Sequence, residues 1–317
     1  MRAVRCENKV PEVVDIPEPS PIKNKDREEV VVNVASAGIC GSDLHLINYG
    51  IGATFGHEFA GTLSDGTPVA VQPIDPCGQC PRCLDGDLQL CVRGPAMAFG
   101  VGRDGGMAEK VLCPTSSLSL LPSGVDVKNG SLVEPLAVAV HGFRRVQCRP
   151  DETVAVIGGG TIGQMAAVVA QQVGAPVQLS ARHEAQRQAA ERLGVALRTD
   201  EQFDVVVEAA GTSAALSEAV NLCRPGGRVL LLGSYWDGGI EFPGMAAAMR
   251  EVNLIPSVMY GRVGPSRDFD AAASILAQRP DLPDAVITHR FPLDAAREAF
   301  AVASDRSAGA IKVVLEP

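Results

Sequence analysis

The chain has 317 residues, of which 46% are hydrophobic and 21% charged, with a formal net charge of −9. This length exceeds what one hydrophobic core usually supports, so about two domains are expected. The negative charge and the aromatic content of only 4% argue against nucleic acid and anionic membranes as partners. No segment resembles a signal peptide or reaches transmembrane length, so we expect a cytoplasmic protein.

The first region, up to about Leu132, predicts a mostly β domain. It is dense in Gly and Pro, and its short apolar runs, such as residues 30–34 and 68–72, are bounded by turn residues. Many short strands separated by turns are typical of irregular β structure.

Two short motifs in this region contain side chains that bind metals. Gly-Ile-Cys-Gly-Ser-Asp-Leu-His supplies Cys40, Ser42 and His45, and Gly-His-Glu supplies His57 and Glu58. A lone Cys or His is more often a core or surface residue than a ligand. A thiolate, an imidazole and a carboxylate in one domain can, however, form an open zinc site with a position left for water or substrate.

A cysteine-rich loop follows, with the spacing Cys-x2-Cys-x2-Cys-x7-Cys. Its members are Cys77, Cys80, Cys83 and Cys91. Four thiolates at this spacing can converge on one tetrahedral zinc ion. Disulfides are the alternative, but three cysteines within seven residues could hardly all reach distant partners in bonding geometry. We therefore predict a closed structural zinc site, whose metal stabilises the loop.

The second region, from about Pro135 to Pro280, alternates strands and helices. Buried strands are expected at residues 153–157, 176–179, 204–207, 228–232 and 252–258, and helices between them include residues 184–193 and 214–223. Apolar strands alternating with helices predict a parallel sheet covered on both faces. The tail, residues 286–314, returns to mixed strand and helix, with an amphipathic helix expected over residues 294–303.

A glycine-rich loop follows the first of these strands and opens a helix running to about Val173. The loop consists of Gly158, Gly159, Gly160, Thr161, Ile162 and Gly163. In this context Gly-x-Gly-x-x-Gly predicts a dinucleotide site, with the pyrophosphate at the helix N-terminus. The alternative is a glycine turn with no ligand.

The end of the second strand of this region bears on the choice of cofactor. NAD enzymes of this fold normally have an acidic residue there, but this strand ends in Ser180-Ala-Arg182. A hydroxyl and a guanidinium suit a 2′-phosphate, so NADP is favoured and NAD remains possible. Arg182 could instead be a solvated residue at the helix start. Arg187 could assist, or could lie on a solvent face.

At this point the chain resembles the zinc-containing medium-chain dehydrogenases and reductases, the alcohol dehydrogenase superfamily. The resemblance is strongest to the polyol (sorbitol) and threonine dehydrogenase branch. The motifs that carry it are those above together with Gly-Gly-Met-Ala-Glu at 105–109, Val-Glu-Pro-Leu at 133–136 and Asp-Val-Val-Val-Glu-Ala-Ala-Gly at 204–211. It implies an α/β protein, with a GroES-like, mostly β catalytic zinc domain (1–134, completed by 281–317) and a Rossmann doubly wound parallel sheet (135–280).

The resemblance also implies roles for individual residues. Cys40 and His57 would ligate the catalytic zinc, with Glu58 at or beside it. Glu134 falls where the alcohol dehydrogenases place a second cysteine ligand, so either Glu58 or Glu134 could be the third ligand. Glu134 could alternatively be an acidic residue stabilised by a helix N-terminus.

A proton relay is implied as well. Ser42 and His45 match the family's relay, in which the hydroxyl passes a proton through the nicotinamide ribose to the histidine. By residue chemistry alone, Ser42 would be a helix cap and His45 a partly exposed surface residue.

We therefore expect a zinc-dependent oxidoreductase that interconverts a secondary alcohol or polyol with its ketone or aldehyde. Zinc and cofactor would meet between the two domains, and the protein would form a homo-oligomer, a dimer or tetramer, as relatives do. A threonine-dehydrogenase-like or biosynthetic dehydrogenase acting on an amino or cyclitol alcohol is a second possibility. A non-catalytic nucleotide sensor is a third, which the complete metal and relay set argues against.

Two segments beside the expected substrate site, residues 46–56 and 61–66, are shorter than is usual in the family. The pocket walls in this region are therefore expected to differ from those of the known polyol enzymes, so the substrates of those enzymes are a weaker guide to this one. Candidates to line the site are Leu46, Tyr49, Phe55 and Phe99, although such residues are more often core.

Overall fold

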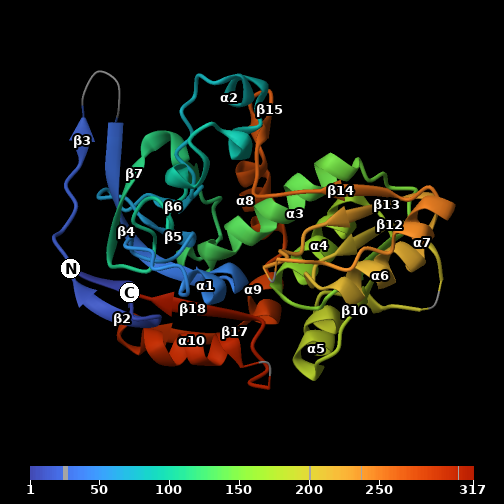
Figure 1. The fold of residues 1–317 in the computed structure, drawn as a ribbon. Helices are drawn as coiled ribbons and strands as arrows, with labels where there is room; N and C mark the ends of the chain where they lie inside the picture. Colours follow the sequence, from blue (N-terminus) through green and yellow to red (C-terminus); the bar gives the residue numbers. More distant parts are fainter. Residues whose placement is uncertain (24–27, 200, 237, 306) are drawn as a thin grey trace. The chain divides into compact units, whose positions relative to one another are not determined.

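The computed structural model describes residues 1–23, 28–199, 201–236, 238–305 and 307–317 (Figure 1). It divides the chain into two compact units. Unit 1 comprises Met1–Glu134, Tyr260–Pro283 and Ile287–Pro317, and unit 2 comprises Pro135–Met259 and Asp284–Val286. No helix within the described part is both long enough and apolar enough to cross a membrane.

Unit 1 is built around an eight-stranded sheet. The sheet has the order β17-β18-β4-β5-β6-β8, and β3 and β7 also pair with β4. Its strands are β3 (Ile22–Lys23), β4 (Glu28–Ile39), β5 (Glu58–Thr62), β6 (Pro68–Val71), β7 (Lys110–Pro114), β8 (Leu118–Leu120), β17 (Ile287–Pro292) and β18 (Lys312–Glu316). Two antiparallel pairs stand apart from it, β1 (Arg2–Glu7) with β2 (Val10–Asp15) and β15 (Arg262–Val263) with β16 (Ser266–Arg267). The mostly β character predicted for this region is therefore observed.

The central strand β4 is longer than the apolar run at 30–34 predicts. Its second half, Ala-Ser-Ala-Gly-Ile, has low strand propensity. It is a strand because β5 pairs with one of its edges and β18 with the other. Tertiary pairing thus carries the strand to Ile39, directly before Cys40.

Short helices complete unit 1. These are α1 (Gly41–Leu46), α2 (Pro81–Asp85), α8 (Asp268–Gln278), α10 (Ala296–Ser304), and the 3-10 turns η1 (Leu88–Leu90), η2 (Gly94–Met97), η3 (Thr115–Ser117), η4 (Val127–Leu132) and η5 (Leu293–Ala295). Helix α10 corresponds to the helix expected over 294–303. Its Phe300 ring lies edge-on to Phe55, with centroids 6.2 Å apart.

Four side chains were candidates to line the substrate site, and two of these assignments are wrong. Phe55 and Phe99 are fully buried in the hydrophobic core of unit 1, because aromatic rings of their size fill the space over the sheet. Leu46 packs against the same core. Tyr49 is 66% exposed.

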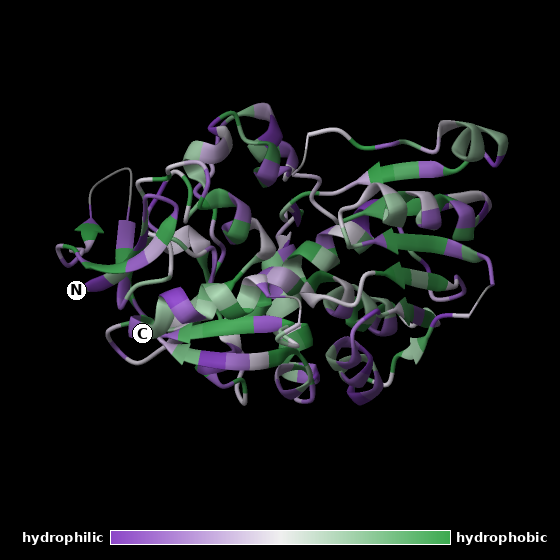
Figure 2. Cartoon of the chain, turned by 60° about the horizontal axis from the view of Figure 1, so that its bottom comes forward, coloured by the Kyte–Doolittle hydropathy of each residue, from purple (hydrophilic) through white to green (hydrophobic). Residues whose placement is uncertain are grey.

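Unit 2 contains a six-stranded sheet in which every pairing is parallel. The order is β11-β10-β9-β12-β13-β14, which is the order of a doubly wound dinucleotide-binding sheet. The strands are β9 (Val154–Ile157), β10 (Val177–Ser180), β11 (Ala196–Leu197), β12 (Phe203–Glu208), β13 (Cys223–Leu231) and β14 (Asn253–Pro256). Figure 2 shows the central strands as continuously hydrophobic, as sheets buried on both faces require.

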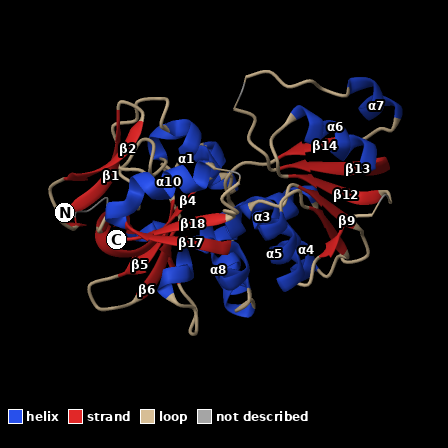
Figure 3. Ribbon diagram, turned by 90° about the horizontal axis from the view of Figure 1, so that it is seen from below, coloured by secondary structure: helices blue, strands red, loops and turns tan. Residues whose placement is uncertain are grey.

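Helices cover the two faces of this sheet. Figure 3 shows α6 (Ser213–Leu222) and α7 (Gly244–Met249) on one side, and α4 (Thr161–Val173) and α5 (Glu184–Arg192) on the other. Helix α3 (Val133–Val146) begins at the end of unit 1 and continues into unit 2, and α9 (Leu282–Val286) likewise contains residues of both. The predicted α/β fold class is confirmed.

The boundary expected at residue 280 is corrected. Residues 260–280 belong to unit 1, not to the dinucleotide-binding unit. Polar contacts with the β8 region hold this segment: Arg267 Nη2 donates to the Leu118 carbonyl at 2.7 Å, and Ser119 Oγ donates to Asp270 Oδ1 at 2.7 Å. The sequence could not show this, because the strand and helix pattern continues across the boundary.

Candidate functional site

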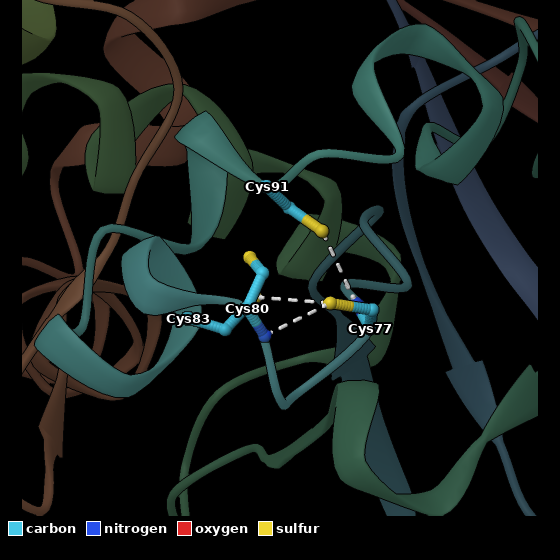
Figure 4. Close-up of side chains that lie close together, drawn as sticks. All are labelled: Cys77, Cys80, Cys83 and Cys91. Carbon is cyan, nitrogen blue, oxygen red and sulfur yellow. Dashed lines mark hydrogen bonds between the residues drawn. The ribbon is translucent and has the colours of Figure 1, made fainter.

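The cysteine loop brings its four thiols together from successive turns (Figure 4). Cys80 precedes α2 and Cys83 lies within it, while Cys91 follows η1. The four sulfur atoms all lie within 4.8 Å of one another. Sulfurs bound to one tetrahedral zinc would be about 3.8 Å apart, given the usual Zn–S distance. The separation of 3.9 Å between the sulfurs of Cys77 and Cys83 agrees with that.

Backbone N–H groups point at these sulfurs. The amides of Cys77 and Arg93 donate to Cys91 Sγ at 3.3 and 3.5 Å, and that of Cys80 to Cys77 Sγ at 3.3 Å. Amides of Val92 and Cys83 lower the pKa of Cys80 to about 6, whereas burial raises that of Cys83 to about 12. Four crowded thiols cannot all ionise without a cation between them, so the loop fits a tetrahedral metal ion.

A second group of metal-binding atoms lies in the same unit. Atoms of Cys40, His57 and Glu58 are within 4.8 Å of one another. Cys40 follows β4 directly, and Glu58 begins β5, where it pairs with Gly38. The register of β4 with β5 therefore places the two sequence motifs side by side.

The ring of His57 is held between two residues of α1. Ser42 Oγ lies 3.3 Å from its Nε2, and Asp43 Oδ1 lies 3.4 Å from its Nδ1. Burial by itself lowers the pKa of His57, but the charges of Asp43 and Cys40 raise it well above its ordinary value. A carboxylate behind a histidine is the usual way to orient that ring toward a metal.

Asp43 is a site residue that the sequence reasoning missed. It is fully buried, and its Oδ2 accepts a hydrogen bond of 2.9 Å from the Cys40 amide. Its place between Cys40 and His45 in the motif was the available signal, but only the structure shows that the carboxylate is buried and so needs a polar partner.

Lys312 was missed as well, and nothing local in the sequence marks it. Its ammonium is buried and lies 2.8 and 2.6 Å from the two carboxylate oxygens of Glu58. It also donates to the Ile39 carbonyl at 3.0 Å. Burial alone lowers the pKa of Lys312, but Glu58 raises it above its ordinary value. Pairing of β18 with β4 brings these residues together across most of the chain.

Gly38 provides the space for this ion pair. A Cβ at Gly38 would overlap Glu58 Oε2. Only glycine is compatible with the carboxylate in this position.

Glu134 stands at the start of α3, as expected for an acidic residue near a helix N-terminus. It is buried, and burial raises its pKa to about 7. The charge of His57 and the hydroxyl of Tyr260 act against that rise in the pKa of Glu134. Among the described residues, however, Glu134 is not in the group whose atoms lie within 4.8 Å. Tyr260 is a further site residue that the sequence reasoning did not identify.

His45 lies on α1 with Ser42 and is partly buried. Both residues of the expected relay thus belong to one short helix, and Ser42 Oγ faces His57.

In unit 2, the three glycines of the loop differ in conformation and in the space around them. Gly158 has φ of +109°, a conformation open to glycine, and a Cβ on Gly163 would overlap the Gly158 carbonyl oxygen. A Cβ on Gly160 would meet nothing within 4 Å. The first and third glycines thus serve the turn, and the second leaves free space at the N-terminus of α4, where phosphates bind.

The side chain of Gln164 braces this loop. It is fully buried, and its Nε2 donates to the Gly159 carbonyl at 3.1 Å and the Gln186 carbonyl at 3.0 Å. The loop is thereby tied to both α4 and α5.

Three predicted cofactor residues lie at or after the end of β10, the third of them, Arg187, within α5. Ser180 is its last residue, and Arg182 is exposed. Arg187 donates to the carbonyl of Arg182 at 2.7 Å and pairs with Glu184 at 2.8 Å. The Arg187 guanidinium is 39% exposed and bridges the Arg182 carbonyl to Glu184, so it braces the turn that carries Arg182 while still facing solvent.

Known protein families and relatives match nearly the whole chain. The family described as Alcohol dehydrogenase GroES-like domain matches residues 26–123, and that described as Glucose dehydrogenase C-terminus matches residues 127–316. The chain is 30% identical over 303 residues to L-galactonate-5-dehydrogenase of Escherichia coli (strain K12), covering 86% of this chain and 87% of that protein.

Solved structures are also similar. A putative zinc-binding dehydrogenase from Sinorhizobium meliloti 1021 bound to NADP has a TM-score of 0.86 at 31% identity, covering 100% of this chain and 99% of that one. Galactitol-1-phosphate dehydrogenase from Escherichia coli has a TM-score of 0.87 at 27% identity, with 100% of each chain covered. On these matches the chain belongs to the zinc-containing medium-chain dehydrogenases and reductases, and is an oxidoreductase that acts on CH–OH groups.

Proposed function

We propose that the protein transfers a hydride between a nicotinamide cofactor and the CH–OH group of a secondary alcohol or polyol, and in reverse reduces the ketone or aldehyde. The observation that carries this proposal is the group formed by Cys40, His57 and Glu58. Three protein ligands of mixed type are characteristic of catalytic zinc, which keeps a position for substrate. A non-catalytic nucleotide sensor would have no need of such a group.

We propose Cys40, His57 and Glu58 as the zinc ligands, with Glu134 bordering the position left for substrate. Support comes from the 4.8 Å grouping, which includes Glu58 but not Glu134. Zinc held there would supply a Lewis acid that stabilises negative charge on the substrate oxygen. Asp43 orients His57, and Lys312 holds Glu58 in place. The second, closed zinc of the cysteine loop would be structural.

The proton of the alcohol leaves through side chains of α1. Ser42 Oγ, which lies 3.3 Å from His57 Nε2, is proposed to accept it, and His45 to pass it toward solvent. A hydroxyl can donate and accept at once, so Ser42 suits a relay.

NADP is the proposed cofactor. Ser180 and Arg182 offer donors where NAD enzymes offer a carboxylate. The similar zinc-binding dehydrogenase from Sinorhizobium meliloti 1021, whose structure is bound to NADP, supports this choice. The phosphates would lie over Gly160 at the N-terminus of α4.

The substrate class is proposed from the relatives. Those matched act, by their names, on a sugar acid, L-galactonate, and on a sugar-alcohol phosphate, galactitol-1-phosphate. A polyhydroxylated substrate with a secondary alcohol is therefore expected.

A homo-oligomer, a dimer or tetramer, and a cytoplasmic location remain predictions. The edge strand β14 and the neighbouring exposed side chains of Met245 and Met249, each 77% accessible, offer a surface for a second copy.

The test is a substrate panel with the purified full chain. Polyols, aldonates, L-threonine and cyclitols are each offered with NADP and NAD, and cofactor reduction is followed by the absorbance of the reduced nicotinamide. Turnover of a polyol or aldonate is expected. Turnover of only threonine or a cyclitol would show that the proposed polyol substrate class is wrong. Turnover that does not depend on zinc would overturn the proposed mechanism.

A further inference from the structure

The described residues place an arginine that no motif marks against the proposed 2′-phosphate site. Arg198 follows β11, and its amide donates to the Leu179 carbonyl at 3.1 Å, which continues the parallel pairing with β10. Its side chain therefore runs beside the last residue of β10. Arg198 Nε donates to Ser180 Oγ at 2.7 Å.

Other contacts fix this guanidinium. Its Nη2 pairs with Glu218 Oε1 on α6 at 2.9 Å, and its Nη1 donates to the Thr199 carbonyl at 3.2 Å. The side chain is only 20% exposed. Arg198 is thus held in one place with Nε directed at Ser180.

This contact decides what Ser180 can offer to a ligand. A guanidinium only donates, so the contact occupies a lone pair of Oγ and directs the hydroxyl proton elsewhere. A phosphate only accepts, and can receive that proton. A ribose 2′-hydroxyl also needs an acceptor for its own proton, and the end of β10, Ser180-Ala-Arg182, supplies no carboxylate for it.

We propose that Arg198 is a positioning residue for cofactor choice, which acts through Ser180 to make the end of β10 a donor-only site for the adenosine 2′-phosphate. The proposal rests on the proposed function, in which the dinucleotide adenosine lies at this strand end. It adds that the preference for NADP depends on a residue that need not touch the phosphate.

The experiment compares the full chain with Ser180→Ala, Arg198→Gln and the double variant. Dissociation constants are measured by calorimetry for NADPH and NADH, and for 2′,5′-ADP and 5′-AMP, which lack the nicotinamide. Each single variant is expected to bind NADPH and 2′,5′-ADP about tenfold more weakly, which corresponds to the loss of one hydrogen bond to a charged group. NADH and 5′-AMP should be unchanged. The double variant should be no weaker than Ser180→Ala alone.

Arg149→Gln is the matched control, because Arg149 precedes β9 and so lies at the opposite end of the strands. It should leave all four constants unchanged. If Arg198→Gln lowers the melting temperature, Arg198→Gln/Glu218→Gln repeats the test without leaving an unpaired carboxylate.

The outcomes separate the two proposals. A wild-type chain that binds NADH as tightly as NADPH would refute the NADP assignment itself. Three results would overturn only the role of Arg198. They are an NADPH preference in Arg198→Gln equal to that of the wild type, an equal loss of affinity for NADPH and NADH, and a double variant whose loss of NADPH affinity is the product of the two single losses.

Discussion

The ammonium of Lys312 lies 2.6 Å from Glu58 Oε2 and 2.8 Å from Oε1, although more than 250 residues separate the two in sequence. Both side chains are almost fully buried. A buried ion pair that loses one partner leaves an uncompensated charge, which costs far more than losing an exposed pair.

Lys312→Met should therefore lower the free energy of unfolding of the metal-free protein by about 3 kcal/mol. Excess zinc should restore more stability to the variant than to the wild type, because the cation can compensate Glu58. Denaturant unfolding with chelator and with zinc measures both effects. Lys110→Met, which breaks the exposed pair with Glu18, is the control and should change the free energy of unfolding little, because exposed ion pairs contribute little to stability. Equal, small losses in both variants would contradict the assigned burial of the pair.

Gly38→Ala should remove the proposed catalytic zinc, because its Cβ would displace the Glu58 carboxylate. Metal analysis should then give one zinc per chain, where two are expected for the wild type. Gly41→Ala, whose Cβ would meet nothing within 4 Å, should keep both. Two zinc ions in Gly38→Ala would mean that Glu58 is not needed to hold the metal.

The two proposed zinc sites should respond differently to loss of one cysteine. Cys40→Ala should abolish turnover with little change in melting temperature, since only an open three-ligand site is altered. Cys80→Ala should mainly lower the melting temperature, because metal binding stabilises the loop. Scanning calorimetry and steady-state kinetics distinguish them, and matching effects would show that the roles have been exchanged.

Gly160→Ala should weaken NADPH binding without changing stability. The Cβ would contact nothing within 4 Å in the protein, so any effect reports the space taken by the pyrophosphate. We expect at least about a tenfold rise in the dissociation constant, an effect of about 1.4 kcal/mol. An unchanged constant would place the phosphates elsewhere.

Because of Asp204, the free energy of unfolding of unit 2 should fall as the pH is lowered into the acid range. Burial alone would raise its pKa, but hydrogen bonds from Thr153 and the guanidinium of Arg224 lower it to about 2. The carboxylate therefore contributes stability above the unfolded pKa of about 3.9, and this is lost as the pH falls toward 2. Asp204→Asn should destabilise by about 1 to 2 kcal/mol at pH 7.

The measurement is urea unfolding followed by the fluorescence of Trp236, the only tryptophan of the chain. The difference between Asp204→Asn and the wild type should shrink from pH 4 downward and vanish near pH 2. A difference that stays constant with pH would show that packing, and not charge, is responsible.

Local patterns in the sequence were sufficient for the repeating parts of the protein. The apolar strands and alternating helices predicted the parallel sheet of unit 2, and the strand before Gly158 and the helix after it predicted the loop between them. The cysteine spacing predicted a cluster that lies within 4.8 Å. Each of these depends on residues close together in the chain, where periodicity and spacing restrict geometry.

Tertiary structure alone decided the residues that complete each site. Lys312 reaches Glu58 because β18 pairs with β4, and Arg198 reaches Ser180 because β11 pairs with β10. The assignment of residues 260–280 to unit 1 has the same origin. The pairing of β18 with β4 joins segments far apart in the chain, so nothing in the sequence around Glu58 specifies Lys312 as its partner.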